Sequence, residues 1–297
     1  MKNNKIRCGY VGIIGRPNVG KSTLINTLIG EKISIVTNKA HTTRDNILGV
    51  LNTSNNQIIF VDTPGLQLKR KALLNQLMAK SINQTMIDSD LIVFMIEASR
   101  ITKQDYMLRD SLIKLSKKTI LVINKIDNIK DKRNLLPFLS KVKKEFDFLS
   151  YVPISSKKKI NLDRLIDQII KNLPVAPIIF SNSFITDKDK KYRVEEIIRE
   201  KLMNSLHEEI PYELKVKVEH IGKEGSRIHI HAVILINKES HKSIVIGKGG
   251  KVLKNVGTLA RKEINFLFGI RSHIELWVKT AESWSDSTSS QLNLDSN

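Results

Sequence analysis

The sequence predicts an α/β domain with a mainly parallel sheet flanked by helices, followed by a smaller α+β domain. The first domain is indicated by short apolar runs that alternate with stretches of helical periodicity, and by polar motifs at the points where the strands would end. The second is indicated after residue 192, where strands of alternating polar and apolar residues replace the continuous runs. A chain of 297 residues is long enough for two packed cores.

Composition indicates a globular chain with an anionic partner. The formal net charge of +19 favours nucleic acid or a membrane surface, although the abundance of Lys, Asn and Ile would also follow from an AT-rich coding sequence. The single cysteine, Cys8, excludes an internal disulfide and fits a reducing, cytoplasmic setting. We expect neither a cleaved signal peptide nor a membrane span, because the apolar run after Lys5 is short and leads directly into the first motif.

That first motif is Gly-Arg-Pro-Asn-Val-Gly-Lys-Ser at residues 15–22, which matches the phosphate-binding pattern G-x-x-x-x-G-K-[ST]. It lies between an apolar run over residues 8–14 and a helical pattern over residues 24–29, which Gly30 is expected to end. In such a loop the backbone N–H groups and the helix N-terminus hold phosphate oxygens, while the lysine reaches the β- and γ-phosphates and the serine ligates Mg²⁺. The candidate residues are Gly15, Arg16, Pro17, Asn18, Val19, Gly20, Lys21 and Ser22.

Two further motifs point to a nucleoside triphosphate. The polar segment His41, Thr42, Thr43, Arg44 and Asp45 precedes the run 47–51, and the segment Asp62, Thr63, Pro64, Gly65 and Leu66 follows the strand expected over residues 58–61. Asp62 would hold Mg²⁺ directly or through water, and the Gly65 N–H would meet the γ-phosphate. Thr43 is the expected second metal-ligating hydroxyl, with Thr42 as the alternative. A bound γ-phosphate would order this switch segment, and hydrolysis would release it.

The motif Asn124-Lys125-Ile126-Asp127 predicts the base. The Asp127 carboxylate can accept hydrogen bonds from the N1–H and the 2-amino group of guanine, whereas adenine would leave it unpaired at a cost of about 1–3 kcal/mol. Asn124 would brace the neighbouring loops, and the Lys125 stem would cover the ring. Backbone N–H groups of Ile154, Ser155 and Ser156 would face the guanine oxygen. The three motifs together predict GTP as the substrate.

These motifs resemble the Era family of bacterial GTPases, which are of the translation-factor class. The resemblance rests on residues 40–44, on residues 62–66 and on the second domain, and it extends to about Thr280. It implies GTP hydrolysis with Mg²⁺. Asn18 is similar to a residue that helps hold a potassium ion in related GTPases, so K⁺ is a further candidate cofactor. Leu66 stands where Ras-like enzymes carry a water-orienting glutamine, which implies slow hydrolysis.

One departure from the family pattern lies beside the base motif. The family commonly carries a glycine shortly after its base-contacting Ser-Ala pair. In this chain Ser156 is followed by Lys157, Lys158, Lys159 and Ile160. We therefore expect this loop to lie differently over the base.

The second domain is predicted to contain a helix over residues 193–206, strands over 214–218 and 228–236, a Gly-x-x-Gly loop, a further helix to residue 267 and a strand over 274–278. This order, with the loop between two helices, resembles a type II KH domain, whose groove receives about four unstacked nucleotides. We expect Trp277 to lie in the core. The expected RNA-binding residues are Lys242, Ile246, Gly247, Lys248, Gly249, Gly250, Lys251 and Lys254.

The sequence Leu173-Pro-Val-Ala-Pro177 interrupts the helical pattern and separates the two domains. The expected boundaries are 1–173 for the P-loop GTPase domain, 174–192 for a linker, 193–280 for the KH domain and 281–297 for a disordered tail.

The family resemblance implies a cytoplasmic, monomeric GTPase that binds 16S ribosomal RNA near its 3′ end and assists assembly of the 30S subunit. It also implies peripheral contact with the inner face of the cell membrane. Two alternatives remain. One is a membrane-associated signalling GTPase whose second domain binds protein or lipid. The other is a P-loop ATPase or kinase, against which Asp127 argues.

Overall fold

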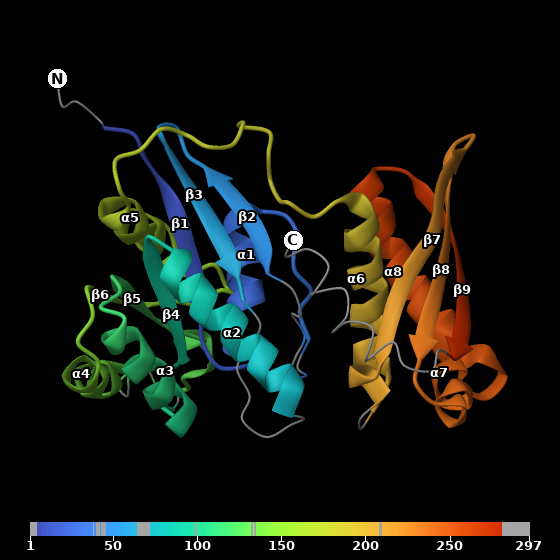
Figure 1. Cartoon of the computed structure of the whole chain (residues 1–297), viewed down its shortest axis with the longest axis horizontal. Helices are drawn as coiled ribbons and strands as arrows, with labels where there is room; N and C mark the ends of the chain where they lie inside the picture. Colours follow the sequence, from blue (N-terminus) through green and yellow to red (C-terminus); the bar gives the residue numbers. More distant parts are fainter. Residues whose placement is uncertain are drawn as a thin grey trace. The chain divides into compact units, whose positions relative to one another are not determined.

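The computed structural model describes residues 5–37, 39, 42, 46–63, 72–98, 100–131, 133, 135–207 and 210–280. The chain forms two compact units, Met1–Lys188 and Asp189–Asn297 (Figure 1). None of the helices in the described ranges combines the length and the apolar content that a membrane span requires.

The first unit is built on a six-stranded sheet with the order β2-β3-β1-β4-β5-β6. Neighbouring strands run parallel, except for the antiparallel hairpin of β2 and β3. β5 is buried throughout and β4 is buried up to its last residue, as expected of parallel strands that are covered on both faces. The strands are β1 (Arg7–Ile14), β2 (Ile47–Asn52), β3 (Asn56–Asp62), β4 (Leu91–Glu97), β5 (Thr119–Asn124) and β6 (Ser150–Pro153).

Helices cover both faces of this sheet. α1 lies behind the sheet in Figure 1, and α2 and α3 lie in front of it. Beneath α2, α3 and α4 is a core that includes Phe94, Leu121 and Phe146, all of them fully buried. α1 ends at Gly30, which has a φ of 82°, as the sequence predicts. The helices are α1 (Lys21–Ile29), α2 (Ala72–Asp88), α3 (Lys103–Lys114), α4 (Leu135–Glu145) and α5 (Leu162–Asn172), with a 3-10 turn η1 (Ile126–Asn128).

Residues 174–188, which we call the edge segment, belong to the first unit. They begin beside the start of β1, where Val175 pairs with Arg7, and continue along the outer edge of β2, where Thr186 pairs with Gly49. The Val50 N–H donates to the Ile185 carbonyl (2.8 Å), and the Leu48 N–H donates to Asp187 Oδ1 (2.9 Å). The rings of Phe180 and Phe184 stack with their centroids 4.4 Å apart, against buried residues of β1, β2 and β3. Much of the segment expected to be a linker therefore packs on the sheet.

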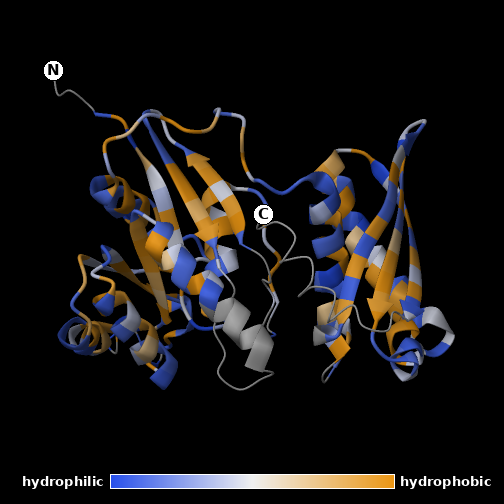
Figure 2. Ribbon diagram, in the orientation of Figure 1, coloured by the Kyte–Doolittle hydropathy of each residue, from blue (hydrophilic) through white to orange (hydrophobic). Residues whose placement is uncertain are grey.

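The second unit has a three-stranded sheet of β7 (Leu214–Glu224), β8 (Arg227–Ile236) and β9 (Arg271–Thr280). β7 and β8 are antiparallel, whereas β8 and β9 are parallel. Its strands alternate between hydrophilic and hydrophobic residues in Figure 2, and the hydrophobic ones form one core with the helices. The helical elements are α6 (Lys190–Ser205), η3 (Ile210–Tyr212), η4 (Glu239–His241), α7 (Lys242–Ile246), η5 (Lys248–Gly250) and α8 (Lys251–Phe268).

The expectation that Trp277 lies in the core is wrong, because its side chain is 59% exposed. Successive side chains of a strand point to opposite faces. Ile274, Leu276 and Val278 of β9 pack into the core, so the odd-numbered Trp277 points away from it.

Candidate functional site

The phosphate loop connects β1 to α1, and Lys21 folds back onto it. The buried Lys21 Nζ donates to the carbonyls of Gly15 (3.1 Å) and Arg16 (3.3 Å). Burial lowers the pKa of this ammonium to about 8, against the opposing influence of the Asp62 carboxylate. Gly20 has a φ of 105°, and a Cβ there would lie 2.4 Å from Asn124 Nδ2, so this position requires glycine. The loop is thus closed around its lysine and fixed against the base motif.

The end of β3 supplies the oxygen atoms of a candidate magnesium site. Asp62 is buried, and its Oδ2 accepts hydrogen bonds from Ser22 Oγ (2.9 Å) and Ser34 Oγ (2.7 Å). Thr63, also buried, donates from Oγ1 to the Ile13 carbonyl (2.9 Å). Hydroxyl and carboxylate oxygens are the hard ligands that Mg²⁺ prefers, so Ser22 and Asp62 fit this ion. Ser34 was missed by sequence reasoning because it stands in no recognisable motif.

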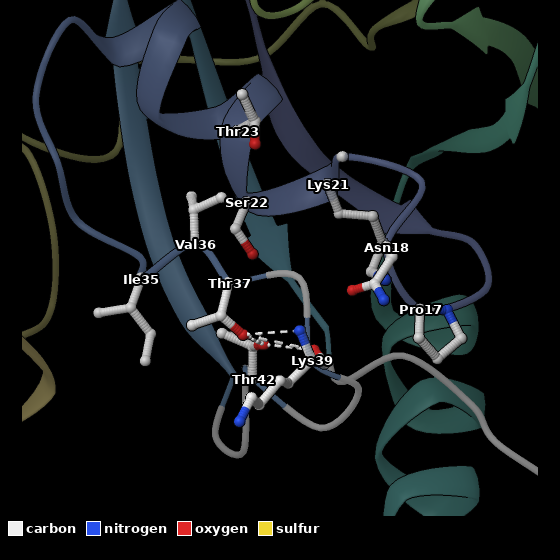
Figure 3. A pocket seen from close by; sticks show the side chains of 11 residues that line it. Pro17, Asn18, Lys21, Ser22, Thr23, Ile35, Val36, Thr37, Lys39 and Thr42 are labelled. Carbon is white, nitrogen blue, oxygen red and sulfur yellow. Dashed lines mark hydrogen bonds between the residues drawn. The ribbon is translucent and has the colours of Figure 1, made fainter. Parts of the chain in front are cut away.

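A pocket lies between the phosphate loop and the segment after α1 (Figure 3). In that view the Ser22 hydroxyl and the Asn18 amide point into it. Thr42 Oγ1 lies 2.6 Å from Thr37 Oγ1 and donates to the Lys39 carbonyl (2.7 Å). The lining residues are Pro17, Asn18, Gly20, Lys21, Ser22, Thr23, Ile35, Val36, Thr37, Lys39 and Thr42. The predicted residues His41, Thr43, Arg44, Asp45, Pro64, Gly65 and Leu66 lie outside the described residues.

Asn124 joins the phosphate loop to the segment that contains Ser156. Its Nδ2 donates to the Val19 carbonyl (2.8 Å), and its Oδ1 accepts from the Ser156 N–H (3.0 Å) and Oγ (3.1 Å). The Ile126 N–H donates to the Ile154 carbonyl (3.2 Å), and Ser155 Oγ donates to Asp127 Oδ1 (2.5 Å). These contacts bring the two segments predicted to bind the base, residues 124–127 and residues 154–156, together at one edge of the sheet.

The backbone N–H groups expected to face a guanine oxygen donate within the protein in this structure. The acceptors are the Ile123 carbonyl for Ile154 (2.8 Å), the Ile160 carbonyl for Ser155 (3.2 Å) and Asn124 Oδ1 for Ser156. A contact with the base through these groups would therefore require one of the bonds to be shared or exchanged.

In the same loop Lys159 has a φ of 56°, in the left-handed region that favours glycine. This chain therefore holds a lysine in the left-handed conformation within the loop that follows Ser156.

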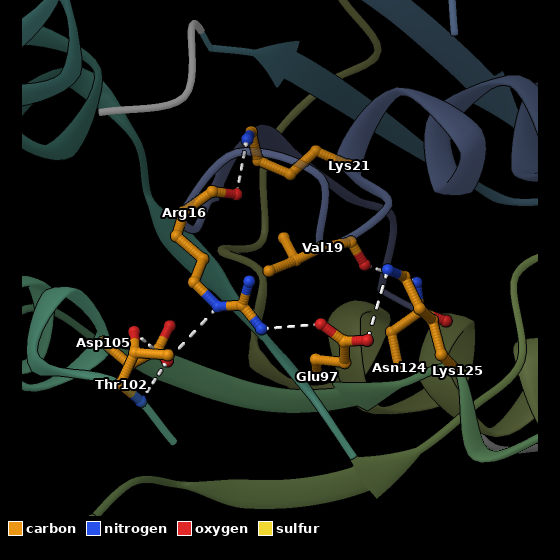
Figure 4. Close-up of polar contacts among 8 residues, drawn as sticks. All are labelled: Arg16, Val19, Lys21, Glu97, Thr102, Asp105, Asn124 and Lys125. Carbon is orange, nitrogen blue, oxygen red and sulfur yellow. Dashed lines mark hydrogen bonds and ion pairs between the residues drawn. The ribbon is translucent and has the colours of Figure 1, made fainter. Parts of the chain in front are cut away.

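Arg16 does not point into the pocket. Its Nη2 lies 2.7 Å from Glu97 Oε2, and its Nε lies 3.4 Å from Asp105 Oδ2 (Figure 4). The acids Glu97 and Asp105 were missed by sequence reasoning, since neither belongs to a motif and each is more than 80 residues from Arg16.

The Gly-x-x-Gly loop of the second unit joins α7 to α8. Lys248, Gly249, Lys251 and Lys254 are exposed, whereas Gly247, Gly250 and Ile246 are half-buried. A Cβ built on Gly249 meets no heavy atom within 4 Å, so the space above this residue is open. Lys242 is partly neutralised by Glu239, whose Oε1 lies 3.1 Å from its Nζ.

Comparisons with known proteins agree with this arrangement. Residues 10–125 match the family described as 50S ribosome-binding GTPase, and residues 209–285 match the KH domain. GTPase Era from Nitrosomonas eutropha is 43% identical over 96% of both chains. GTPase Era from Yersinia pestis is 41% identical, over 95% of this chain and 93% of the relative.

Two solved structures of Era are each 39% identical to this chain and cover 94% of it and 95% of their own chains. One is an Era variant from Aquifex aeolicus bound to GDP and AlF4⁻, with a TM-score of 0.88. The other is Era in complex with MgGDPNP and nucleotides 1506–1542 of 16S ribosomal RNA, with a TM-score of 0.89. The predicted fold, a P-loop GTPase domain followed by a KH domain, is confirmed. With this identity over nearly its whole length, the chain belongs to the Era family of GTPases.

Proposed function

We propose that this chain is a GTP-hydrolysing switch that binds the 3′ region of 16S ribosomal RNA and assists assembly of the small ribosomal subunit. The main observation behind this proposal is that one chain combines two sites. One is a phosphate loop that encloses Lys21 and is hydrogen-bonded to Asn124 of the guanine motif. The other is an open Gly-x-x-Gly loop flanked by exposed lysines. The solved complex of Era with MgGDPNP and a 16S ribosomal RNA fragment supports this combination.

Guanine recognition is assigned to Asp127. Its carboxylate accepts from the Ser155 hydroxyl at 2.5 Å, which fixes its orientation. A carboxylate is an acceptor only, so it would pair with the N1–H and the 2-amino group of guanine and be left unpaired by adenine.

Ser22 and Asp62 would hold Mg²⁺, which neutralises the charge that develops on the phosphates during hydrolysis. Lys21 would leave its loop carbonyls for the phosphate oxygens, since these carry more negative charge.

Asn18, whose amide points into the pocket, is proposed as a potassium ligand near the phosphates. Turnover in KCl and in NaCl at equal ionic strength tests this ligand. Equal rates would remove the potassium proposal.

RNA binding is assigned to the Gly-x-x-Gly loop and its surroundings. The open space above Gly249 would admit a phosphodiester backbone, and Lys248, Lys251 and Lys254 would neutralise its phosphates. Ile244, 50% exposed on the adjoining α7, offers an apolar surface for unstacked bases. Binding should therefore weaken steeply with salt, and single-stranded RNA should compete better than a perfect duplex.

The base assignment is tested with the Asp127→Asn variant. An amide presents a donor where guanine also presents one, so preference should move from guanosine towards xanthosine nucleotides. Titration of both nucleotides against both proteins measures this change. An unchanged preference would show that the guanine pocket is assigned wrongly.

The RNA assignment is tested by replacing Lys248 and Gly249 with Asp. RNA affinity should be lost while GTP turnover without RNA is retained, because the phosphate loop lies in a separate unit. Lys217→Asp, an exposed charge reversal on β7, is the matched control and should bind RNA normally. Undiminished RNA affinity in the double variant would contradict the proposal. If the double variant keeps its RNA affinity and also binds anionic vesicles, the alternative of a membrane-associated signalling GTPase is favoured.

A further inference from the structure

Glu97, the last residue of β4, lies between the phosphate loop and the base motif. It is in register with Asn124 at the end of β5, and the Ala98 N–H next to it donates to the Asn124 carbonyl (2.9 Å). Its side chain is 18% exposed. A carboxylate at this point is within reach of both halves of the nucleotide site (Figure 4).

Each oxygen of this carboxylate contacts a different half of the site. Oε2 accepts from Arg16 Nη2 of the phosphate loop at 2.7 Å. Oε1 lies 3.5 Å from Lys125 Nζ of the base motif. Burial alone raises the pKa of Glu97, but the hydrogen bond from Arg16 and the charge of Lys125 outweigh it and leave the pKa below its usual range. Glu97 is therefore an ionised bridge between the two motifs.

The two cations depend on Glu97 to different degrees. Arg16 has a second acid in Asp105, which is fully buried and fixed by hydrogen bonds from the Thr102 N–H and Oγ1, both 2.8 Å. Lys125 pairs, within the described part of the chain, with Glu97. Its backbone is in the left-handed region, with a φ of 64°, at the turn that leads into η1. Removing the Glu97 charge would thus release Lys125 while Arg16 stays anchored.

We propose that Glu97 is a positioning residue that holds the Lys125 side chain over the guanine ring and ties it to the phosphate loop. This inference rests on the proposed nucleotide site. Glu97 touches no reacting atom in this scheme, so it acts on nucleotide binding and leaves the chemical step unchanged.

Steady-state GTP hydrolysis by the full chain tests the role of Glu97. Glu97→Gln should raise KM for GTP about three- to fivefold, the size expected for a partly exposed ion pair, with kcat unchanged within about twofold. The exposed acid Asp110, paired with Arg109 on α3, provides the matched control, and Asp110→Asn should leave both constants unchanged. A merely structural role would reduce the active fraction and hence kcat, with KM intact.

A double-mutant cycle with Lys125→Met identifies the residue through which Glu97 acts. Once Lys125 is absent, Glu97→Gln should add less than about twofold to KM, because coupled residues are not additive. A full additional increase, or an unchanged KM in Glu97→Gln itself, would overturn the inference. Asp127→Asn in the same series distinguishes a failure of the Glu97 role from a failure of the proposed guanine site. If that variant changes base preference while Glu97→Gln has normal KM, the positioning role fails alone. If the wild type shows no preference for guanine, both fail.

Discussion

Two glycines of the Gly-x-x-Gly loop should respond very differently to the same substitution. Gly247 has φ 76° and ψ 162°, a region that is essentially restricted to glycine, and a Cβ there would lie 2.4 Å from Val252 Cγ2 of α8. Gly249 has φ 60° and ψ 29°, and its Cβ would meet nothing within 4 Å. A side chain at Gly247 therefore meets both backbone strain and a steric clash, whereas a side chain at Gly249 meets backbone strain alone.

The magnitudes follow from these geometries. Gly249→Ala costs about 1–2 kcal/mol of left-handed strain and recovers about 0.4–1 kcal/mol from a less flexible unfolded chain, so the net loss is about 0–1.6 kcal/mol. Gly247→Ala costs about 1–3 kcal/mol for the glycine-only region and a further 1–3 kcal/mol for overpacking against Val252, and it recovers the same amount of about 0.4–1 kcal/mol, so the net loss is about 1–5.6 kcal/mol.

Denaturant unfolding monitored by tryptophan fluorescence measures the difference. Trp277 on β9 is the tryptophan within the described residues, so the signal follows the second unit. The free energy of unfolding should fall much further for Gly247→Ala than for Gly249→Ala. Equal losses, or a larger loss for Gly249→Ala, would show that the clash with Val252 does not decide the stability of this loop.

Three further predictions concern single side chains. Lys159→Gly should raise the unfolding free energy of the first unit by about 0.5–1 kcal/mol, seen as a higher Tm, because a φ of 56° strains a lysine and not a glycine. Gly20→Ala should weaken GDP binding by at least about tenfold in a fluorescent-nucleotide titration, since the new Cβ would collide with Asn124 Nδ2; normal affinity would contradict this packing. Burial raises the pKa of Glu195, whose carboxyl group also accepts a hydrogen bond from the Val218 N–H (2.7 Å). Its contribution to the free energy of unfolding is therefore complete below the pKa of the unfolded state and is lost as pH rises through the pKa of the folded state. Glu195→Gln should therefore reduce the loss of stability of the second unit as the pH rises above 4.5, measured by the same fluorescence assay; an identical pH profile would argue against it.

The motifs and the order of elements could be predicted from the sequence because each depends on residues close together in the chain. The loop around Lys21 and the stop at Gly30 are examples, since their geometry follows from neighbouring glycines and helical spacing. The contacts of Arg16 with Glu97 could not be predicted, because 81 residues separate them and an acid at the end of a strand is an unspecific signal.

The Trp277 error has a different cause. Its size and hydrophobicity favour burial, but the alternation set by Ile274, Leu276 and Val278 decides which face it occupies. Alternation along a strand is thus a better guide than the hydrophobicity of one residue.

The edge segment has a consequence for how the first unit can be isolated. β2 is an outermost strand of the sheet, and the edge segment occupies the hydrogen-bonding groups of Leu48 and Val50. A chain cut after Leu173 would leave that strand uncovered beside an apolar patch, and exposed edges of this kind recruit other chains into aggregates. A chain cut after Lys188 retains the edge segment on β2. The edge segment therefore protects the first unit against self-association.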